Sequence, residues 1–519
     1  MKNSDPLFLL IKSMTKSEKR HFKLSMGGFK GKKDKNYMLL FDVFDSQKTY
    51  EEKAIKKKLA KAPSFRNLPF NKIYLYEQIL KSLRIYYDEQ SAQMRLNSYL
   101  SDIEVLYRKE LYSDCHELVK KAKRFAIKYE KQAYLFSLIT WEMQLAWNLR
   151  DEEQITQLRN KSVEEWQEVI LQSQEINDLR KIYFETLRDM RTWGIARSEN
   201  EMNRADEILE HPLMGRQSTL QQSELARNAI RVHIAHRKGN FEQEYFWIKQ
   251  RVQIWGEKPH LIKDNLSNYF QNITQQADIG IKLFKFKEAE EVLQNLKRIC
   301  ETNSSEISFK RKSDIRIMEV EILSKKGEFR SAVKLLPGMI AFMEAHLSQL
   351  DPLSELVYYY CVFRTYFGNG DFDEAHSYLP RVIHFPHPVI VNLQSQARII
   401  NLILQYERKE YIYLGHLLSS TYRFLLKNKR IYQTETIIID FLRKAFRFTS
   451  QKDILTGLAE MKQKVVILRQ QRFEQNFLDQ FPLLDWIDSK ILNKPLAEII
   501  RERYEEAMIK EEKESGKLL

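Results

Sequence analysis

Glycine and proline are scarce in this chain of 519 residues, which contains 15 glycines and 12 prolines. β-Sandwiches and barrels need many tight turns, which these two residue types usually supply. Their scarcity therefore favours long helices joined by short connections. The three cysteines, Cys115, Cys300 and Cys361, lie far apart and form no C-x-x-C motif. They predict small buried side chains in a reducing compartment rather than a disulfide framework.

Long apolar runs are also absent. Nowhere do 18 apolar residues follow one another, so we expect no membrane span. The apolar run at residues 6–11 is too short for a secretory signal and has no cleavage site. With 43% apolar and 30% charged residues, the composition is that of a globular protein. We therefore expect a soluble cytoplasmic protein that forms several domains or one elongated array.

Positive charge is concentrated near the beginning of the sequence. The formal net charge is +14, and residues 1–88 alone hold 20 Lys and Arg against 9 Asp and Glu. This asymmetry makes a contact between residues 1–88 and nucleic acid, or another anion, possible. We expect an exposed basic loop over residues 27–35 and a basic helix over residues 51–61. The candidate contacts on them are Lys30, Lys32, Lys33, Lys35, Lys56, Lys57, Lys58 and Lys61.

One short pattern, G-x-[FY]-x-x-A followed by an apolar stripe, recurs along the chain and is clearest at residues 327–332 and 370–375. Its bulky residue serves as the anchor of each copy. The anchors are Tyr112, Met202, Phe241, Phe286, Phe329, Phe372 and Tyr411. From Met202 onward their spacings are 39, 45, 43, 43 and 39 residues, and a degenerate copy is expected near residues 155–158. A period near 43 predicts a stacked array of helix pairs.

The positions around each anchor predict two helices joined by a tight turn. Apolar residues stand six and seven positions after all seven anchors, and a small residue stands three positions after five of them. These offsets share one face of a helix. Nine positions before six anchors another apolar residue recurs, which gives the first helix its own buried stripe. A glycine before the anchor would supply a left-handed turn; Glu110, Phe284 and Glu410 replace it in three copies.

At these residues the segment 96–430 resembles tetratricopeptide-repeat (TPR) proteins. The resemblance implies an all-α fold, an α-α superhelical solenoid of about eight long helix-turn-helix repeats. The sequence departs from that family in its period, which exceeds 34 residues, and in bulky residues at Val320, Phe363 and Leu402. The family's groove residues are therefore not transferred. HEAT-type arrays, which have a matching period but lack this turn, are the alternative.

The two ends do not fit the repeat. Residues 1–95 predict a basic helical module, and the stretch 12–20 is similar to the start of uncharacterised bacterial TPR-like proteins. Residues 431–519 predict three helices that cap the array and a charged tail. The expected organisation is thus a module at 1–95, repeats at 96–430 and a cap at 431–519.

Motifs for catalysis are matched only superficially. Residues 373–376 spell DEAH, but no phosphate loop or preceding strand accompanies them. The loop at 27–33 lacks the spacing of a Walker motif, and His384 with His387 lacks further metal ligands. We therefore predict no enzymatic activity, no cofactor, no metal site and no small-molecule substrate.

The remaining hypotheses concern binding. Tyr358, Tyr359 and Tyr360 are consecutive, and three consecutive residues of a helix are not expected all to face inward, so we expect one to line a partner groove. The leading hypothesis is a non-enzymatic scaffold that binds another protein or peptide. The alternative is a regulator that contacts nucleic acid through the basic N-terminal module.

Overall fold

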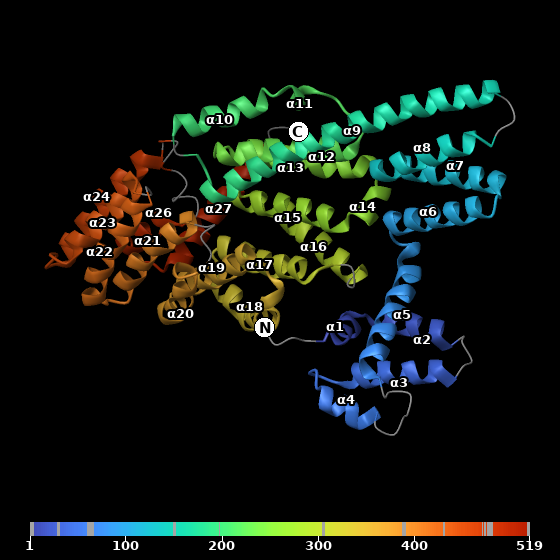
Figure 1. Cartoon of the computed structure of the whole chain (residues 1–519). Helices are drawn as coiled ribbons and strands as arrows, with labels where there is room; N and C mark the ends of the chain where they lie inside the picture. Colours follow the sequence, from blue (N-terminus) through green and yellow to red (C-terminus); the bar gives the residue numbers. More distant parts are fainter. Residues whose placement is uncertain are drawn as a thin grey trace. The chain divides into compact units, whose positions relative to one another are not determined.

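The structure is a computed structural model of the whole chain (Figure 1). It describes residues 5–27, 32–59, 67–148, 152–196, 198–303, 307–386, 391–428, 431–469, 471, 474 and 481–515. In these residues there are 26 α-helices, one short 3₁₀ helix and no strand. The predicted all-α fold is confirmed, and consecutive helices pack against one another as a solenoid requires.

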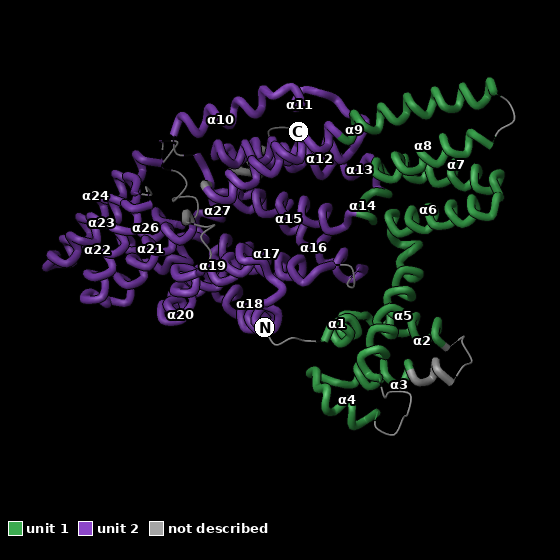
Figure 2. Tube along the Cα trace, viewed as in Figure 1, with its two compact units in different colours: residues 1–173, 260–264 green, residues 174–259, 265–519 purple. Residues whose placement is uncertain are grey.

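The chain divides into two compact units (Figure 2). Unit 1 contains residues 1–173 and 260–264, and unit 2 contains residues 174–259 and 265–519. One long helix, α9 (Glu152–Trp193), contributes residues to both. The boundaries expected from sequence, at residues 95 and 430, mark where the repeat pattern begins and ends, and they stay a prediction.

The first five helices of unit 1 share one hydrophobic core. They are α1 (Pro6–Ser13), α2 (Lys16–Gly27), α3 (Lys32–Ser46), α4 (Glu52–Leu59) and α5 (Leu68–Asp88). Asp5 caps α1, because its side chain accepts hydrogen bonds from the backbone N–H groups of residues 7 and 8. α2 is a separate helix because Thr15 and Glu18 form a capping box, with bonds of 2.5 and 3.2 Å.

The rest of unit 1 consists of α6 (Ala92–Arg108), α7 (Tyr112–Lys128), α8 (Gln132–Ala146), the first part of α9 and α14 (His260–Asp264). α14 is tied to this unit by Asp264, which accepts a 2.9 Å hydrogen bond from the backbone of Ala92 and forms an ion pair with Lys131. The residues 155–158, where a degenerate repeat was expected, lie near the start of α9.

Unit 2 is a succession of helical pairs. After the rest of α9 come α10 (Glu199–Leu209), α11 (Pro212–Gly215), α12 (Gln221–Arg237), α13 (Phe241–Glu257), α15 (Leu266–Lys282), α16 (Phe286–Thr302), α17 (Phe309–Lys325), α18 (Phe329–Glu344), α19 (Pro352–Asn369), α20 (Phe372–Ile383), α21 (Val391–Glu407), α22 (Tyr411–Lys427), α23 (Gln433–Ala445), α24 (Gln451–Arg469), α26 (Leu483–Ile491) and α27 (Leu496–Ser515). The single 3₁₀ helix, η2 (Leu347–Gln349), precedes α19.

Helix length accounts for the long period. Nine of the described helices have the same length of 17 residues, namely α6, α7, α12, α13, α15, α16, α17, α21 and α22. At a rise of 1.5 Å per residue each is roughly 25 Å long. Two such helices, a three-residue turn and a short connection give a repeat near 43 residues.

The predicted turns are largely confirmed. Six of the seven anchors are the first residue of a helix, and only Met202 differs, because α10 begins earlier, after its Ser198 cap. Two residues before these six anchors the backbone has a positive φ of 61–88°; the residues are Glu110, Gly239, Phe284, Gly327, Gly370 and Lys409. In the last copy this residue was expected to be Glu410, which was wrong by one position.

Each of these turns carries the same hydrogen bond. The N–H that follows the left-handed residue donates to a carbonyl five residues earlier, as from Glu328 to Leu323 at 2.8 Å and from Asp371 to Tyr366 at 2.9 Å. This is the Schellman arrangement, which satisfies carbonyl groups at the end of the first helix. Glu130 and Asn493 form two further turns of this kind, which the sequence pattern did not identify.

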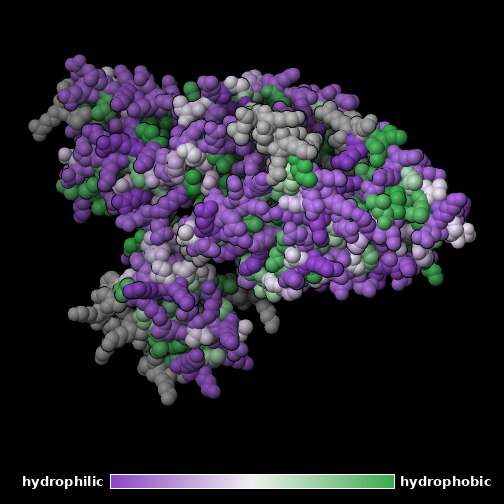
Figure 3. Space-filling view, turned by 180° about the vertical axis from the view of Figure 1, so that it is seen from behind, coloured by the Kyte–Doolittle hydropathy of each residue, from purple (hydrophilic) through white to green (hydrophobic). Residues whose placement is uncertain are grey.

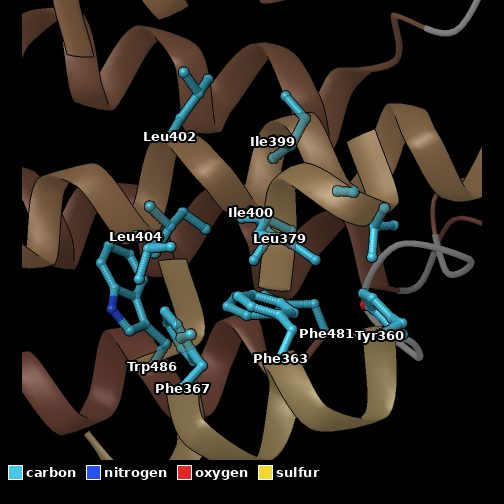
Figure 4. Packing of buried hydrophobic residues seen from close by; sticks show 14 of the residues in the cluster. Tyr360, Phe363, Phe367, Leu379, Ile399, Ile400, Leu402, Leu404, Phe481 and Trp486 are labelled. Carbon is cyan, nitrogen blue, oxygen red and sulfur yellow. The ribbon is translucent and has the colours of Figure 1, made fainter. Parts of the chain in front are cut away.

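The predicted stripes form the core of the array. All five small residues three positions after an anchor are buried, as are all six apolar residues nine positions before one. Figure 4 shows this packing around Phe363, Leu379 and Leu402, where Phe481 and Trp486 from the C-terminal region join the cluster. The C-terminal helices are therefore part of the core of unit 2.

Candidate functional site

The first helices of three consecutive pairs in unit 2 carry charged side chains at one repeated position. α15, α17 and α19 pack side by side, and eight residues before their anchors stand Asp278, Glu321 and Arg364. All three side chains are half-buried, although the residue just before each is fully buried in the core. With Lys325, one helical turn beyond Glu321, they form what we call the charged row.

The surroundings of the charged row oppose ionisation. Burial, and then the neighbouring carboxylates of Glu321 and Asp314, raise the pKa of Asp278 to about 8. Burial, and then the nearby guanidinium of Arg364, lower the pKa of Lys325 to about 8. Groups whose pKa values are shifted this far by burial and by specific charged neighbours are candidates for a functional site.

The members of the charged row differ in their partners. Glu321 and Arg364 face each other at 3.7 Å. Among the described residues, by contrast, no hydrogen bond or ion pair engages the carboxylate of Asp278 or the ammonium group of Lys325. Ionising a half-buried group that has no partner costs free energy, and the pKa values of Asp278 and Lys325 are shifted toward their neutral forms for this reason. A bound segment that supplied the opposite charges would recover that cost.

The helices α26 and α27 border the charged row. Asp485 of α26 is close enough to Lys325 to influence its pKa, and its own carboxylate pairs with Arg503 of α27 at 2.6 Å. Glu407, at the same repeat position as Lys325 in the α21–α22 pair, accepts 2.6 Å hydrogen bonds from Trp486 and Lys490 of α26. α26 thus already occupies the equivalent position two helical pairs further along the array.

The tyrosines predicted to line a groove are all in the core. Tyr358, Tyr359 and Tyr360 are only 0%, 6% and 7% exposed, so the expectation that one of them reaches the surface is wrong. The physical reason is that α19 is enclosed on several sides, by α17, α18, α20 and α27. Tyr360 lies among the clustered side chains of Figure 4, and burial raises its pKa to about 12.

The predicted lysines fall into three groups. Lys30 and Lys61 lie outside the described residues. Lys32, Lys33 and Lys35 lie in α3, so the expectation of a loop is wrong for them, because this helix already begins at Lys32. The side chains of Lys56, Lys57 and Lys58 are exposed on α4, where Lys56 pairs with Glu52 at 2.7 Å. Of the predicted lysines whose side chains the structure describes, Lys56, Lys57 and Lys58 stand consecutively on one exposed helix.

The described surface is largely polar. Figure 3 shows hydrophilic residues over most of one face, with hydrophobic ones in scattered patches. Among the described residues, no cluster of three or more His, Cys, Asp or Glu is arranged to hold a metal ion. None of the described helices has the length and apolar character that crossing a membrane demands.

Comparison with known proteins gives no family. No protein-family model matches the sequence, and no curated protein matches it. The site must therefore be interpreted from its own geometry.

The charged row was missed by sequence reasoning. A signal was present, since Asp278, Glu321 and Arg364 each stand eight residues before an anchor. Charged residues on a helix usually mark a solvent-facing side, however, and nothing in one sequence shows that neighbouring helices partly cover this side.

Proposed function

We propose that this chain is a non-enzymatic scaffold that binds another protein or peptide on a TPR-like helical array. The observation that carries the proposal is the charged row, with its half-buried and unpaired Asp278 and Lys325 on adjacent first helices. Arrays of stacked helical pairs offer extended surfaces, and extended surfaces suit protein segments. The cytoplasmic location and the likeness to TPR proteins belong to the same proposal.

The signs of the charges define the partner. A segment that fills the row needs a basic side chain near Asp278 and an acidic side chain near Lys325. Because these groups are half-buried, the effective dielectric constant around them is lower than in water and each ion pair is correspondingly stronger. Recognition is expected to be selective for charge pattern, with hydrophobic contacts secondary.

The test compares two matched lysines in the full-length protein. Lys325→Met removes the ammonium group of the row, and Lys334→Met removes an exposed lysine from the outer side of α18. Each variant, at native expression and physiological salt, is used to capture partners, and the affinity for each captured protein is then measured. We expect Lys325→Met to weaken binding at least tenfold and Lys334→Met to leave it unchanged.

Two results would contradict the proposal. One is the recovery of no protein partner by the wild-type chain under these conditions. The other is a partner that binds the wild type and both variants equally well, since the charged row would then play no part. Circular dichroism of each variant confirms that its helices are intact before either result is interpreted.

A second candidate function is favoured by the three exposed lysines of α4. In this alternative the chain contacts nucleic acid through residues 1–88. The affinity of the full-length protein for DNA and RNA should then fall steeply between 50 and 200 mM salt, because phosphate contacts release counterions. Replacing Lys56, Lys57 and Lys58 together by Glu should remove most of this binding. Affinity that is absent, or flat with salt, eliminates the alternative.

A further inference from the structure

The C-terminal helix α27 lies across a repeat turn at very short range. A Cβ atom added to Gly327 would stand 2.6 Å from the carbonyl oxygen of Ala497 and 2.7 Å from the backbone nitrogen of Arg501. Distances this short leave no space for any side chain at that turn. The backbone of α27 therefore rests directly on the turn between α17 and α18.

One face of α27 reaches the neighbouring pair. The ring of Tyr504 meets Phe286, the first residue of α16, edge to face with centroids 5.0 Å apart. The ammonium group of Lys326 stands 5.5 Å from the centre of the Tyr504 ring and also pairs with Glu290 at 2.5 Å. Met508, one helical turn after Tyr504, packs against the same hydrophobic cluster. We call Phe286, Lys326 and Gly327 the α27 seat.

α27 is attached less firmly than the helices beneath it. Of its described side chains only Ile499 is buried, whereas most of α19 is buried. The ion pairs of its described side chains are with α26 or with Lys494 just before it: Arg503 pairs with Asp485 and Asp488, and Lys494 pairs with Glu498 and Glu502. Segments with few buried apolar contacts open at a lower free energy than the core.

We propose that the α27 seat is a docking surface for a helix of a protein partner, and that α27 competes with that helix for it. The occupant is an amphipathic helix with the pattern of α27, an aromatic residue followed four positions later by Met or another large apolar residue. The occupant is defined by the helix already seated there. This inference rests on the proposed scaffold function and names the class of its partner and its regulation.

Competition also links the seat to the charged row. Asp485 of α26 is the carboxylate that influences Lys325 from the C-terminal region, and Arg503 holds Asp485 to α27. When α27 leaves its seat, Asp485 loses this partner.

The experiment uses the full-length protein and a fluorescent peptide with the sequence of residues 494–515. Tyr504→Ala with Met508→Ala removes the side chains that face the seat. Glu505→Ala with Ile509→Ala changes two exposed residues at the same spacing, each one position further along the helix. Fluorescence anisotropy measures peptide binding to the wild type and to both double variants.

We expect the peptide to bind the Tyr504→Ala, Met508→Ala protein at least tenfold more tightly than the wild type or the control variant. Adding Phe286→Ala to that protein should abolish the gain. Equal binding to all three proteins, or no binding to a folded Tyr504→Ala, Met508→Ala protein, overturns the inference.

A second measurement needs no variant. Hydrogen exchange of the wild-type chain should be at least a hundredfold faster in residues 496–509 than in α19. Equal protection of the two helices also overturns the inference, because α27 would then open only with the core. Both measurements use the chain's own sequence, so a negative result would overturn this inference and leave the scaffold function untouched. Failure to capture a partner would instead remove the partner helix, while the exchange of α27 on the seat could still be measured.

Discussion

Replacing Gly327 by Ala should have two effects: it strains the left-handed turn, and it pushes against the backbone of α27. Gly327 and Gly370 occupy equivalent turns, with φ of +76° and +88°, where L-residues are strained. A Cβ on Gly370 would meet nothing within 4 Å, whereas a Cβ on Gly327 would collide with the backbone of α27. Gly370→Ala is therefore a matched control that introduces the backbone strain alone.

The magnitudes follow from these contacts. A left-handed alanine costs roughly 1–2 kcal/mol, and both variants bear this cost. In Gly327→Ala, α27 must also move away, which forfeits the burial of Ile499, roughly 1.5–3 kcal/mol, and the Phe286–Tyr504 ring contact, about 0.5–1.5 kcal/mol. The additional loss of about 2–4.5 kcal/mol is limited by the docking free energy of α27, because this helix can detach while the core stays folded.

Urea denaturation followed by circular dichroism measures the loss of stability, and hydrogen exchange shows where it occurs. We expect faster exchange across residues 496–509 in Gly327→Ala and unchanged exchange there in Gly370→Ala. Similar stability and similar exchange in the two variants would refute the reasoning, since α27 would then not rest on this turn.

Three further predictions concern the packing at Gly368, the left-handed residue Lys409 and the half-buried carboxyl group of Asp278. Gly368→Ala should destabilise the protein by about 1–3 kcal/mol in thermal denaturation, because its Cβ would overlap the ring of Phe329. Gly338→Ala, at a helical site with open space around it, should instead raise the free energy of unfolding by up to about 1 kcal/mol. Equal effects of the two substitutions would contradict this prediction. Lys409→Gly should stabilise by roughly 1 kcal/mol in urea by removing a left-handed Cβ, and a loss would show that its side chain is needed. Asp278, with its folded pKa raised to about 8, keeps a proton that the unfolded chain has released, so its contribution to stability falls as pH rises from about 4 to 8. Asp278→Asn should remove that fall and stabilise the protein at pH 8 by on the order of 1–3 kcal/mol in urea; an unchanged pH profile would exclude this assignment.

The turns could be predicted because they depend on local sequence. A bulky residue, a small residue three positions later and an apolar stripe are all determined within one helix, and six anchors begin a helix as this pattern requires. The left-handed residue was predicted less well. Only three of the eight such turns have glycine there; Glu130, Phe284, Lys409 and others accept the strain because the Schellman bond and the packing of both helices fix the backbone.

Contacts between distant segments were beyond prediction from one sequence. The periodicity of one helix predicts a buried side and an exposed side. α19 instead packs against four other helices, and its three consecutive tyrosines are all buried. The seating of α27 on Gly327 joins residues about 170 positions apart, and no local pattern records it. The charged tail after Pro495, for which the sequence predicts a frayed helix, is the helix α27 as far as Ser515.

The residues nine and eight positions before the anchors have different tasks. The first fill the core that the fold requires, and the second are available to contact a partner. Nine residues before the anchors, the side chains are apolar and buried in every copy where they were predicted, because each must fill the core between two helices. One residue later the side chain changes from Asp278 to Glu321 to Arg364 along three neighbouring helices, and all three are half-buried. Packing does not dictate this change of sign, since the same backbone accommodates either charge. Specificity for a partner is therefore most readily encoded at this second position, and it is there that substitutions should alter binding while leaving the array folded.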